Sequence, residues 1–224
     1  MSTFSDPDII ASYAEMAERN VPALHDLHRM VSVLLAEKAP SDGRILVLGA
    51  GGGLELRAMA RQKPDWRFDG VDPSAQMLNQ ARTVTREFAD RITLYEGYIT
   101  DAPEGPYDGA TCLLTLHFLS REERCRTLRE ICRRLRPGAP LVVVHHSFVN
   151  DDAGKEKWLS RFSNYVATFG MGDAGKGINV EAMKERLPVL SPEQDVSILH
   201  EAGFSQVELF YAALTFKGWV ACRT

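Results

Sequence analysis

The feature that most restricts the fold of this sequence is a regular alternation of short apolar runs with helix-length segments between residues 44 and 146. Helical segments of this length between strands are typical of βαβ units, which form a mostly parallel sheet covered by helices on both faces. The predicted strands are 44–49, 67–72, 91–97, 107–116 and 141–146, and the predicted helices are one ending near Gln62, then 74–88 and 121–135.

The C-terminal part of the chain predicts a different kind of connection. A helix over 192–202 ends at Gly203, and two further strands follow at 206–212 and 215–223. The link between these strands is too short for a crossover helix, so they must pair as an antiparallel hairpin. We therefore expect an α/β fold with a mostly parallel seven-stranded sheet that ends in this hairpin.

Two segments lie outside the alternation, and the whole chain, 1–224, reads as one domain. Residues 1–40 predict two helices, the first starting near Pro7, that form an N-terminal cap. Residues 147–192 predict a helical lid inserted between the fifth strand and the last helix. The lid places aromatic side chains at helical spacing along one stripe and then continues into the glycine-rich connector "GMGDAGKG". The aromatic residues of the stripe are Trp158, Phe162, Tyr165 and Phe169.

Charge and cysteine content narrow the class of function. The formal net charge is −4, which gives no electrostatic footprint for non-specific nucleic-acid binding. The four cysteines form no C-x-x-C pair, so we expect neither a disulfide framework nor a metal site. There is no apolar run near 18 residues and no basic, apolar leader. The expectation is a soluble, cytoplasmic protein without a membrane partner.

The loop after the first predicted strand is nearly free of side chains. Gly49, Ala50, Gly51, Gly52 and Gly53 precede Leu54, and such a loop lets backbone N–H groups approach a ligand closely. The dinucleotide fingerprint G-x-G-x-x-G fails because its sixth position is leucine, whereas G-x-G-x-G fits. No Lys-Ser/Thr pair follows the glycines, which excludes a P-loop. This pattern by itself leaves a dinucleotide and S-adenosylmethionine open.

An acidic residue ends the second predicted strand. Asp72 lies 19 residues after Gly53, where a carboxylate can accept hydrogen bonds from both ribose hydroxyls of a nucleoside. The alternative is that Asp72 caps the helix that starts near Ser74, since Asp-Pro-Ser suits a turn. The two roles are compatible, and together with the glycine loop we favour ribose binding.

Several motifs, in this order, resemble one enzyme superfamily over nearly the whole chain. They are "ILVLGAGGG", "GVDPSAQML", "LYEGYITDAPEGPYDGATCLLTLHFL", "LREICRRLRPGAPLVVVH" and "LHEAGFSQVELFYAALTFKGWVA". They resemble class I S-adenosylmethionine-dependent methyltransferases, which have a Rossmann-like fold. Within this superfamily, "YAEMAERNVPALHDL" and "LHEAGF" resemble the tRNA wobble-uridine methyltransferases that use carboxy-S-adenosylmethionine.

This resemblance implies roles for residues at the strand ends. The loop glycines would contact the methionine part of the cofactor, the second strand would end at the ribose, and residues after the third strand would flank the adenine. The residues that the resemblance assigns to the cofactor S-adenosyl-L-methionine are Gly49, Ala50, Gly51, Gly53, Asp72, Pro73, Met77, Tyr98, Ile99 and Leu113.

The sequence also departs from the superfamily at defined positions. Val47 stands where the first strand usually carries an acidic residue, and Tyr98 replaces the usual adenine-contacting aspartate. Leu24 and Leu113 stand where the tRNA enzymes have tyrosine and asparagine. The arginine that pairs with the extra carboxylate of the modified cofactor has no clear counterpart near Met183 and Lys184, which would leave that carboxylate without a partner. We therefore expect ordinary S-adenosylmethionine.

Histidines supply the candidate catalytic groups. His117 follows the fourth strand, and His145 and His146 end the fifth, at the edge where open α/β sheets bind ligands. Adjacent strand residues point to opposite faces, so His145 and His146 cannot both face one pocket. Methyl transfer by in-line displacement needs a general base only when the acceptor arrives protonated with a high pKa.

The expected acceptor is a small molecule enclosed by the N-terminal helices and the lid. The residues expected to contact it are Tyr13, Arg19, His117, His146, Trp158 and Phe162. A tRNA-modifying enzyme is left open but not favoured, as is a protein that binds the cofactor without transfer activity. An NAD-dependent oxidoreductase is disfavoured by Leu54 and by the terminal hairpin. Relatives in this family often pair, so a homodimer remains an open expectation.

Overall fold

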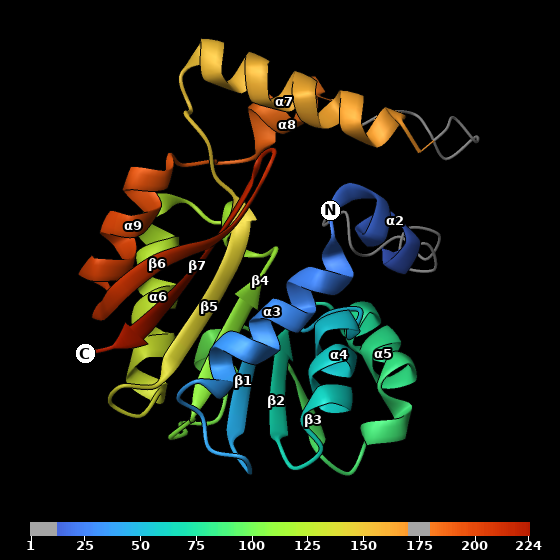
Figure 1. The fold of residues 1–224 in the computed structure, drawn as a ribbon, viewed down its shortest axis with the longest axis vertical. Coiled ribbons are helices and arrows are strands. Elements are labelled where there is room, and N and C mark those ends of the chain that lie inside the picture. The colour runs from blue at the N-terminus through green and yellow to red at the C-terminus, as the bar shows by residue number, and fades with distance from the viewer. Residues whose placement is uncertain (1–12, 170–179) are drawn as a thin grey trace.

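The computed structural model describes residues 13–169 and 180–224, which form one seven-stranded sheet with helices on both faces (Figure 1). This architecture confirms the α/β fold predicted from the sequence. The predicted start of the first helix near Pro7 and the glycine-rich connector of the lid lie outside the described residues.

The strand order places the glycine loop at the centre of the sheet. The order is β3-β2-β1-β4-β5-β7-β6; the first five strands are parallel, and β7 pairs antiparallel with both β5 and β6. Because β1 lies between β2 and β4, the chain direction across the sheet reverses beside it, and ligands bind at such switch points. The strands are β1 Arg44–Leu48, β2 Arg67–Asp72, β3 Ile92–Glu96, β4 Gly109–Leu113, β5 Pro140–His146, β6 Phe204–Ala213 and β7 Phe216–Arg223.

The helices follow the predicted segments, with one interruption. The segment predicted as a single helix over 74–88 is an α-helix that ends at Val84, followed by a 3₁₀ turn at Arg86–Phe88. Helix starts carry the expected caps: for example, Ser120 Oγ accepts from the Glu123 N–H. The helices are α2 Tyr13–Asn20, α3 Leu24–Ala36, α4 Leu54–Gln62, α5 Ala75–Val84, α6 Arg121–Arg134, α7 Asp152–Ala167, α8 Val180–Arg186 and α9 Pro192–Glu201.

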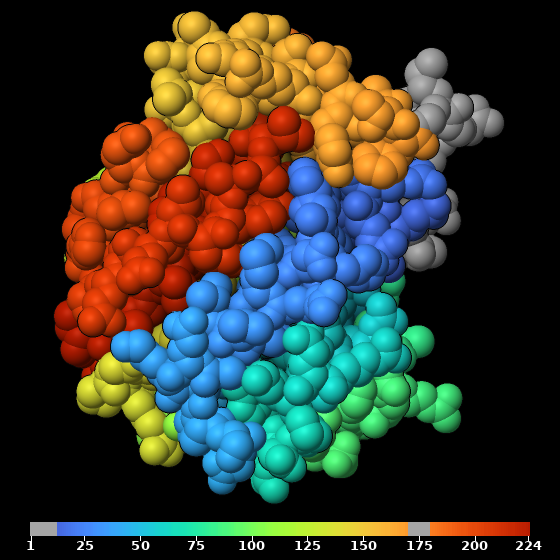
Figure 2. Space-filling view, viewed as in Figure 1, coloured from blue at the N-terminus to red at the C-terminus, as the bar shows by residue number. Residues whose placement is uncertain are grey.

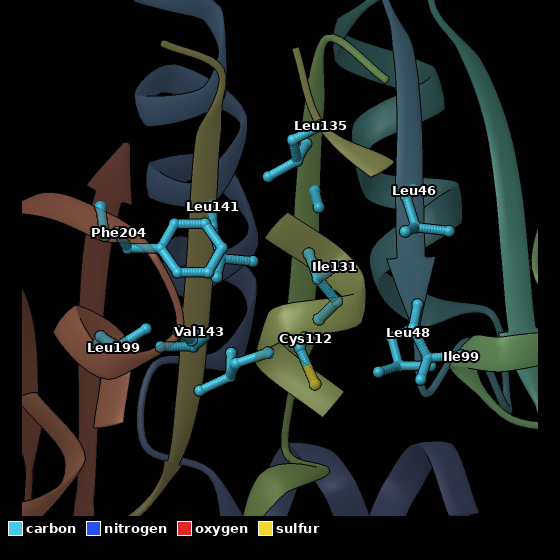
Figure 3. Packing of buried hydrophobic residues seen from close by; sticks show 14 of the residues in the cluster. Leu46, Leu48, Ile99, Cys112, Ile131, Leu135, Leu141, Val143, Leu199 and Phe204 are labelled. Carbon is cyan, nitrogen blue, oxygen red and sulfur yellow. The ribbon is translucent and has the colours of Figure 1, made fainter. Parts of the chain in front are cut away.

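Two cores cover the two faces of the sheet. Alternate residues of β1 point to opposite faces, so Leu46 and Leu48 pack with α6 and α9, whereas Ile45 and Val47 pack with α3 and α4. Figure 3 shows the first of these cores, with Ile131 of α6 lying between β1 and β5. Both faces of the central strands are buried, as expected for a parallel sheet.

Helices α7 and α8 lie together across the C-terminal ends of the strands (Figure 1). A small core of Phe148, Leu159 and Val189 holds this lid together. Val166 and Met183 of the lid also pack on the cluster that contains residues of α2 and α3, and in Figure 2 the surface of α7 continues onto the N-terminal helices. Among the described residues, no helix is long and apolar enough to cross a membrane.

Candidate active site

The glycine loop wraps closely around the end of β2. Gly49 and Ala50 each donate their N–H to the Val71 carbonyl, at 2.8 and 3.1 Å. Gly49 has a φ of +80°, and a Cβ atom there would lie 2.0 Å from Thr115 Oγ1. Only glycine fits this position, because both the backbone conformation and the neighbouring hydroxyl exclude a side chain. The loop therefore presents bare backbone at the C-terminal edge of the sheet.

Asp72 plays the capping role that its sequence position suggests, and it also holds the glycine loop. Its Oδ2 accepts the Gly51 N–H at 3.0 Å and its Oδ1 accepts the Ser74 N–H at 2.8 Å, so it positions the loop and starts α5. Burial raises the pKa of Asp72, whereas these two hydrogen bonds lower it. A carboxylate has about four acceptor positions. Two therefore remain for ribose hydroxyls, so this carboxylate fits the nucleoside part of the cofactor.

The loop borders a small internal cavity of about 20 Å³, which is room for roughly one water molecule. The side chain of Tyr13 closes one side of it: a Cβ atom on Gly52 would lie 2.4 Å from Tyr13 Cε1. Three residues that the sequence assigned to the cofactor site contribute to the wall. The lining residues are Tyr13, Ala17, Leu24, Leu27, His28, Gly49, Gly51, Leu54, Glu55, Leu113 and Leu114.

Glu55 is a site residue that sequence reasoning missed. It lies in the first turn of α4, is only 9% exposed, and its Oε1 accepts the Thr111 hydroxyl at 2.6 Å. Burial raises the pKa of Glu55 to about 8, despite the opposing effect of this hydrogen bond. The sequence does carry a signal, because Glu55 stands four residues before Met59 on the apolar stripe of the helix.

The other residues assigned to the cofactor occupy different environments. Met77 is buried beneath the loop, where its carbonyl accepts the Gly52 N–H at 3.0 Å, and Pro73 is exposed. Tyr98 is 67% exposed at the end of β3, while Ile99 is buried in the core on the α6 side. Of the two residues predicted to flank the adenine, Tyr98 is exposed and Ile99 is buried.

His117 and His146 lie together in a buried aromatic cluster at the ends of β4 and β5. Their ring centroids are 4.7 Å apart, and His146 stacks on Phe216 at 4.1 Å and meets Phe162 of α7 edge-on at 5.3 Å. Nδ1 of His146 lies 2.9 Å from Thr215 Oγ1. Burial lowers the pKa of His146 to about 3 and that of His117 well below its ordinary value. Both imidazoles are therefore neutral.

His145 points to the opposite face of the sheet, as the strand alternation predicts. Its Nε2 lies 3.2 Å from Asp195 Oδ2, and its ring packs against Trp219. Asp195 is also paired with Arg124, and all three polar side chains are buried. This network joins β5, α6 and α9 and lies on the face of the sheet away from the cavity. His145 therefore belongs to a structural network and does not face the cavity.

The aromatic residues of the lid are spaced along one side of α7, as predicted, but they lie in different surroundings. Phe162 is buried towards His146, whereas Trp158 lines an outer groove and lies under the cations of Arg161 and Lys217. The surroundings of Trp158 and Phe162 differ because residues of the β6–β7 hairpin line the groove beside Trp158, which the helical spacing alone does not reveal. Arg19 is likewise on the outer side of α2, where it pairs with Glu15.

Comparison with known proteins finds a similar family over part of the chain. Residues 45–138, which run from β1 to the turn before β5, match the family model described as a methyltransferase domain. This part of the chain is therefore similar to a methyltransferase domain. The motifs predict S-adenosylmethionine as the cofactor, and one structure of similar fold, PigF, holds S-adenosylhomocysteine.

Proteins similar to this chain over most of its length include a curated relative and two solved structures that share its fold. A carboxy-S-adenosyl-L-methionine synthase from Chromohalobacter salexigens is 28% identical over 223 residues, covering 97% of this chain and 82% of the relative. An O-methyltransferase family protein from Burkholderia thailandensis has a TM-score of 0.71 at 14% identity, and PigF with S-adenosylhomocysteine has 0.65 at 20%. These two structures match 99% and 98% of this chain, which spans 61% and 60% of their lengths.

The buried histidines of the protein predict that its stability falls in acid. Burial lowers the pKa of His28 to about 4 and that of His146 to about 3, so the unfolded chain takes up protons near pH 6.5 that the folded chain does not. We expect the free energy of unfolding to decline as the pH falls from 6.5 towards 4, by up to about 1.4 kcal/mol per pH unit for each histidine. Urea unfolding at several pH values measures this slope.

The matched control for this slope is His25, which is exposed on the same helix as His28. The H28Q variant is expected to have a shallower pH slope than the wild type, and the H25Q variant an unchanged one. A slope that both variants leave unchanged would mean that His28 is protonated in the folded chain.

Proposed function

We propose that this methyltransferase transfers a methyl group to a small-molecule acceptor by in-line displacement. The observation that carries the proposal is the buried cluster of His117, His146, Phe162 and Phe216, which lies beneath α7 at the strand ends. Neutral imidazoles and aromatic rings suit a partly apolar metabolite, whereas a nucleic-acid partner would require a basic surface. The formal net charge of −4 agrees with this choice.

The residues of the chain would act chiefly by positioning and by excluding water. When bound, the cofactor supplies a methyl group on a sulfonium, and transfer needs an acceptor atom aligned behind it. Asp72 and the glycine loop would hold the nucleoside and methionine parts. A neutral imidazole at His146 or His117 can accept a hydrogen bond from an O–H or N–H group and align it. Their lowered pKa values favour this orienting role over full proton abstraction.

Substitution on the two sides of α7 tests where the acceptor lies. We expect F162L to raise the acceptor KM about tenfold, because it removes an aromatic contact from the buried cluster, and to leave the Kd for S-adenosylmethionine nearly unchanged. W158A, on the outer groove, serves as the comparison and is expected to change the acceptor KM less. If both variants weaken acceptor and cofactor binding equally, α7 does not define the acceptor site.

The direct test is formation of S-adenosylhomocysteine with a panel of small O-, N- and C-nucleophiles. Turnover with one class supports the proposal and identifies the attacking atom. Binding of S-adenosylmethionine without turnover on any member favours a protein that has lost transfer activity. Affinity for tRNA that falls steeply with salt would instead support the tRNA-modifying alternative.

One observation favours a second candidate function. The relative with 28% identity is named as a carboxy-S-adenosyl-L-methionine synthase and matches 97% of this chain. A carboxylated cofactor requires a cation near its added carboxylate, yet Lys184 of the lid pairs with Glu156 and Glu181 at the surface. Mass spectrometry of the cofactor that copurifies with the protein distinguishes S-adenosylmethionine from its carboxylated form, because the carboxylated form is heavier by one carbon dioxide unit.

A further inference from the structure

Glu55 is a buried carboxyl group that the proposed transfer reaction does not use. It lines the same cavity as Gly49 and Gly51, the loop residues assigned to the methionine part of the cofactor. Burying a carboxyl group is costly unless it is well paired. Its Oε1 accepts a hydroxyl hydrogen bond from Thr111, which offsets this cost only in part. A buried acid that faces a binding cavity therefore calls for a functional explanation.

The position of Glu55 relates it to the missing acid of β1. Val47 of β1 and Thr111 of β4 are register partners on adjacent parallel strands, so their side chains lie side by side on one face. Because Glu55 accepts a hydrogen bond from Thr111, its carboxyl group lies on the same face of the sheet as Val47. The acidic group absent from the strand is thus supplied from the first turn of α4.

We propose that Glu55 is a cofactor-binding residue whose carboxylate pairs with the cationic methionine end of S-adenosylmethionine. That end carries an α-ammonium and a sulfonium, and the cavity wall offers Glu55 as a charge of the opposite sign. The proposal rests on the cofactor of the methyltransferase family and not on the identity of the acceptor.

Among the titratable groups around the cavity, Glu55 is the one whose pKa allows it to release a proton near neutral pH. Burial raises the pKa of Tyr13 on α2 to about 12 and lowers that of His28 on α3 to about 4. Burial also raises the pKa of the Cys112 thiol on β4. Asp72 on β2 is already engaged by two backbone N–H groups. With a pKa of about 8, Glu55 is mostly protonated at pH 7 in the empty protein.

Pairing with a cation favours the charged carboxylate, so cofactor binding releases a proton. At pH 7 the release approaches one proton per cofactor. The association constant is then expected to rise by up to tenfold between pH 6 and pH 7. This range lies below the pH at which an α-amino group loses its own proton.

The experiment is isothermal titration calorimetry of the full chain with S-adenosylmethionine, in buffers of different ionisation enthalpy at pH 6, 6.5 and 7. We expect E55Q to weaken binding about tenfold or more, and to abolish both the proton release and the pH slope. The control is E208Q, which makes the same side-chain substitution at an exposed position of β6 and is expected to behave as the wild type.

Thermal unfolding without cofactor separates binding from folding. E55Q is expected to unfold at the wild-type temperature or above, because it removes a buried ionisable group. Added cofactor is expected to raise its unfolding temperature by less than that of the wild type. S-adenosylhomocysteine lacks the sulfonium charge but keeps the α-ammonium. Proton release with both ligands identifies the ammonium as the partner, and release with S-adenosylmethionine alone identifies the sulfonium.

The two proposals fail in different ways. If E55Q binds S-adenosylmethionine with wild-type affinity and proton release, the role of Glu55 is wrong, and the proposed methyl transfer is unaffected. If the wild type binds the cofactor and releases a proton but transfers no methyl group to any acceptor, the proposed function fails and the role of Glu55 stands. A wild-type protein that does not bind the cofactor overturns both.

Discussion

Replacing Asp72 with alanine is expected to weaken binding of S-adenosylmethionine on the order of a hundredfold. The substitution removes the acceptor of the Gly51 N–H, which positions the glycine loop, and the two remaining acceptor positions proposed for the ribose hydroxyls. Hydrogen bonds to a charged group contribute about 1.5–3 kcal/mol each, and a hundredfold change corresponds to about 2.8 kcal/mol. Calorimetry with the cofactor measures the change directly.

The matched control for Asp72 is Asp151, which also accepts a backbone hydrogen bond at a helix start. Asp151 Oδ1 accepts the Gly154 N–H at 2.7 Å at the first turn of α7, away from the glycine loop. D151A should destabilise the helix start to a similar degree and leave cofactor affinity unchanged. Cofactor binding by D72A within a few-fold of the wild type would show that the ribose lies elsewhere.

The fold could be predicted because its determinants are local in the sequence. Short apolar runs and helix-length spacers predict all seven strands, and the short link after β6 predicts the antiparallel hairpin. The boundaries were less accurate: β4 ends at Leu113 instead of residue 116. Leu114 adopts a left-handed φ of +57°, and a 3₁₀ turn begins at Leu116. A single residue of left-handed backbone is not encoded by apolar spacing.

The site could be predicted only where its parts are close in the chain. The glycine loop and Asp72 follow from spacing, and the opposite faces of His145 and His146 follow from the strand period. Glu55 was missed because its meaning depends on Thr111, 56 residues away on a neighbouring strand. The separation of Trp158 from the buried cluster depends on the hairpin beside α7, which belongs to the other end of the sequence.

The largest loss of stability is expected from breaking the buried pair of Arg124 and Asp195. Arg124 is fully buried and also donates to the Pro188 carbonyl at 3.2 Å, so it ties α6 to α9 and to the segment that follows α8. Burial alone would raise the pKa of Asp195, but His145 and Arg124 hold it below its ordinary value. D195N should therefore lower the free energy of unfolding by about 3–5 kcal/mol, because it leaves a buried guanidinium without its counterion.

The chain contains its own control for this prediction. Arg121 and Glu201 join the same two helices at 2.5 Å, but at the surface, where both side chains are more than a third exposed. E201Q is therefore expected to change the urea midpoint only slightly, since water and salt screen the pair. The double variant R124M/D195L, which replaces the buried charges with apolar groups, should recover most of the loss. If D195N and E201Q shift the midpoint equally, the buried pair does not hold α6 and α9 together. If the double variant is no more stable than D195N, the loss arises from packing and not from the unpaired charge.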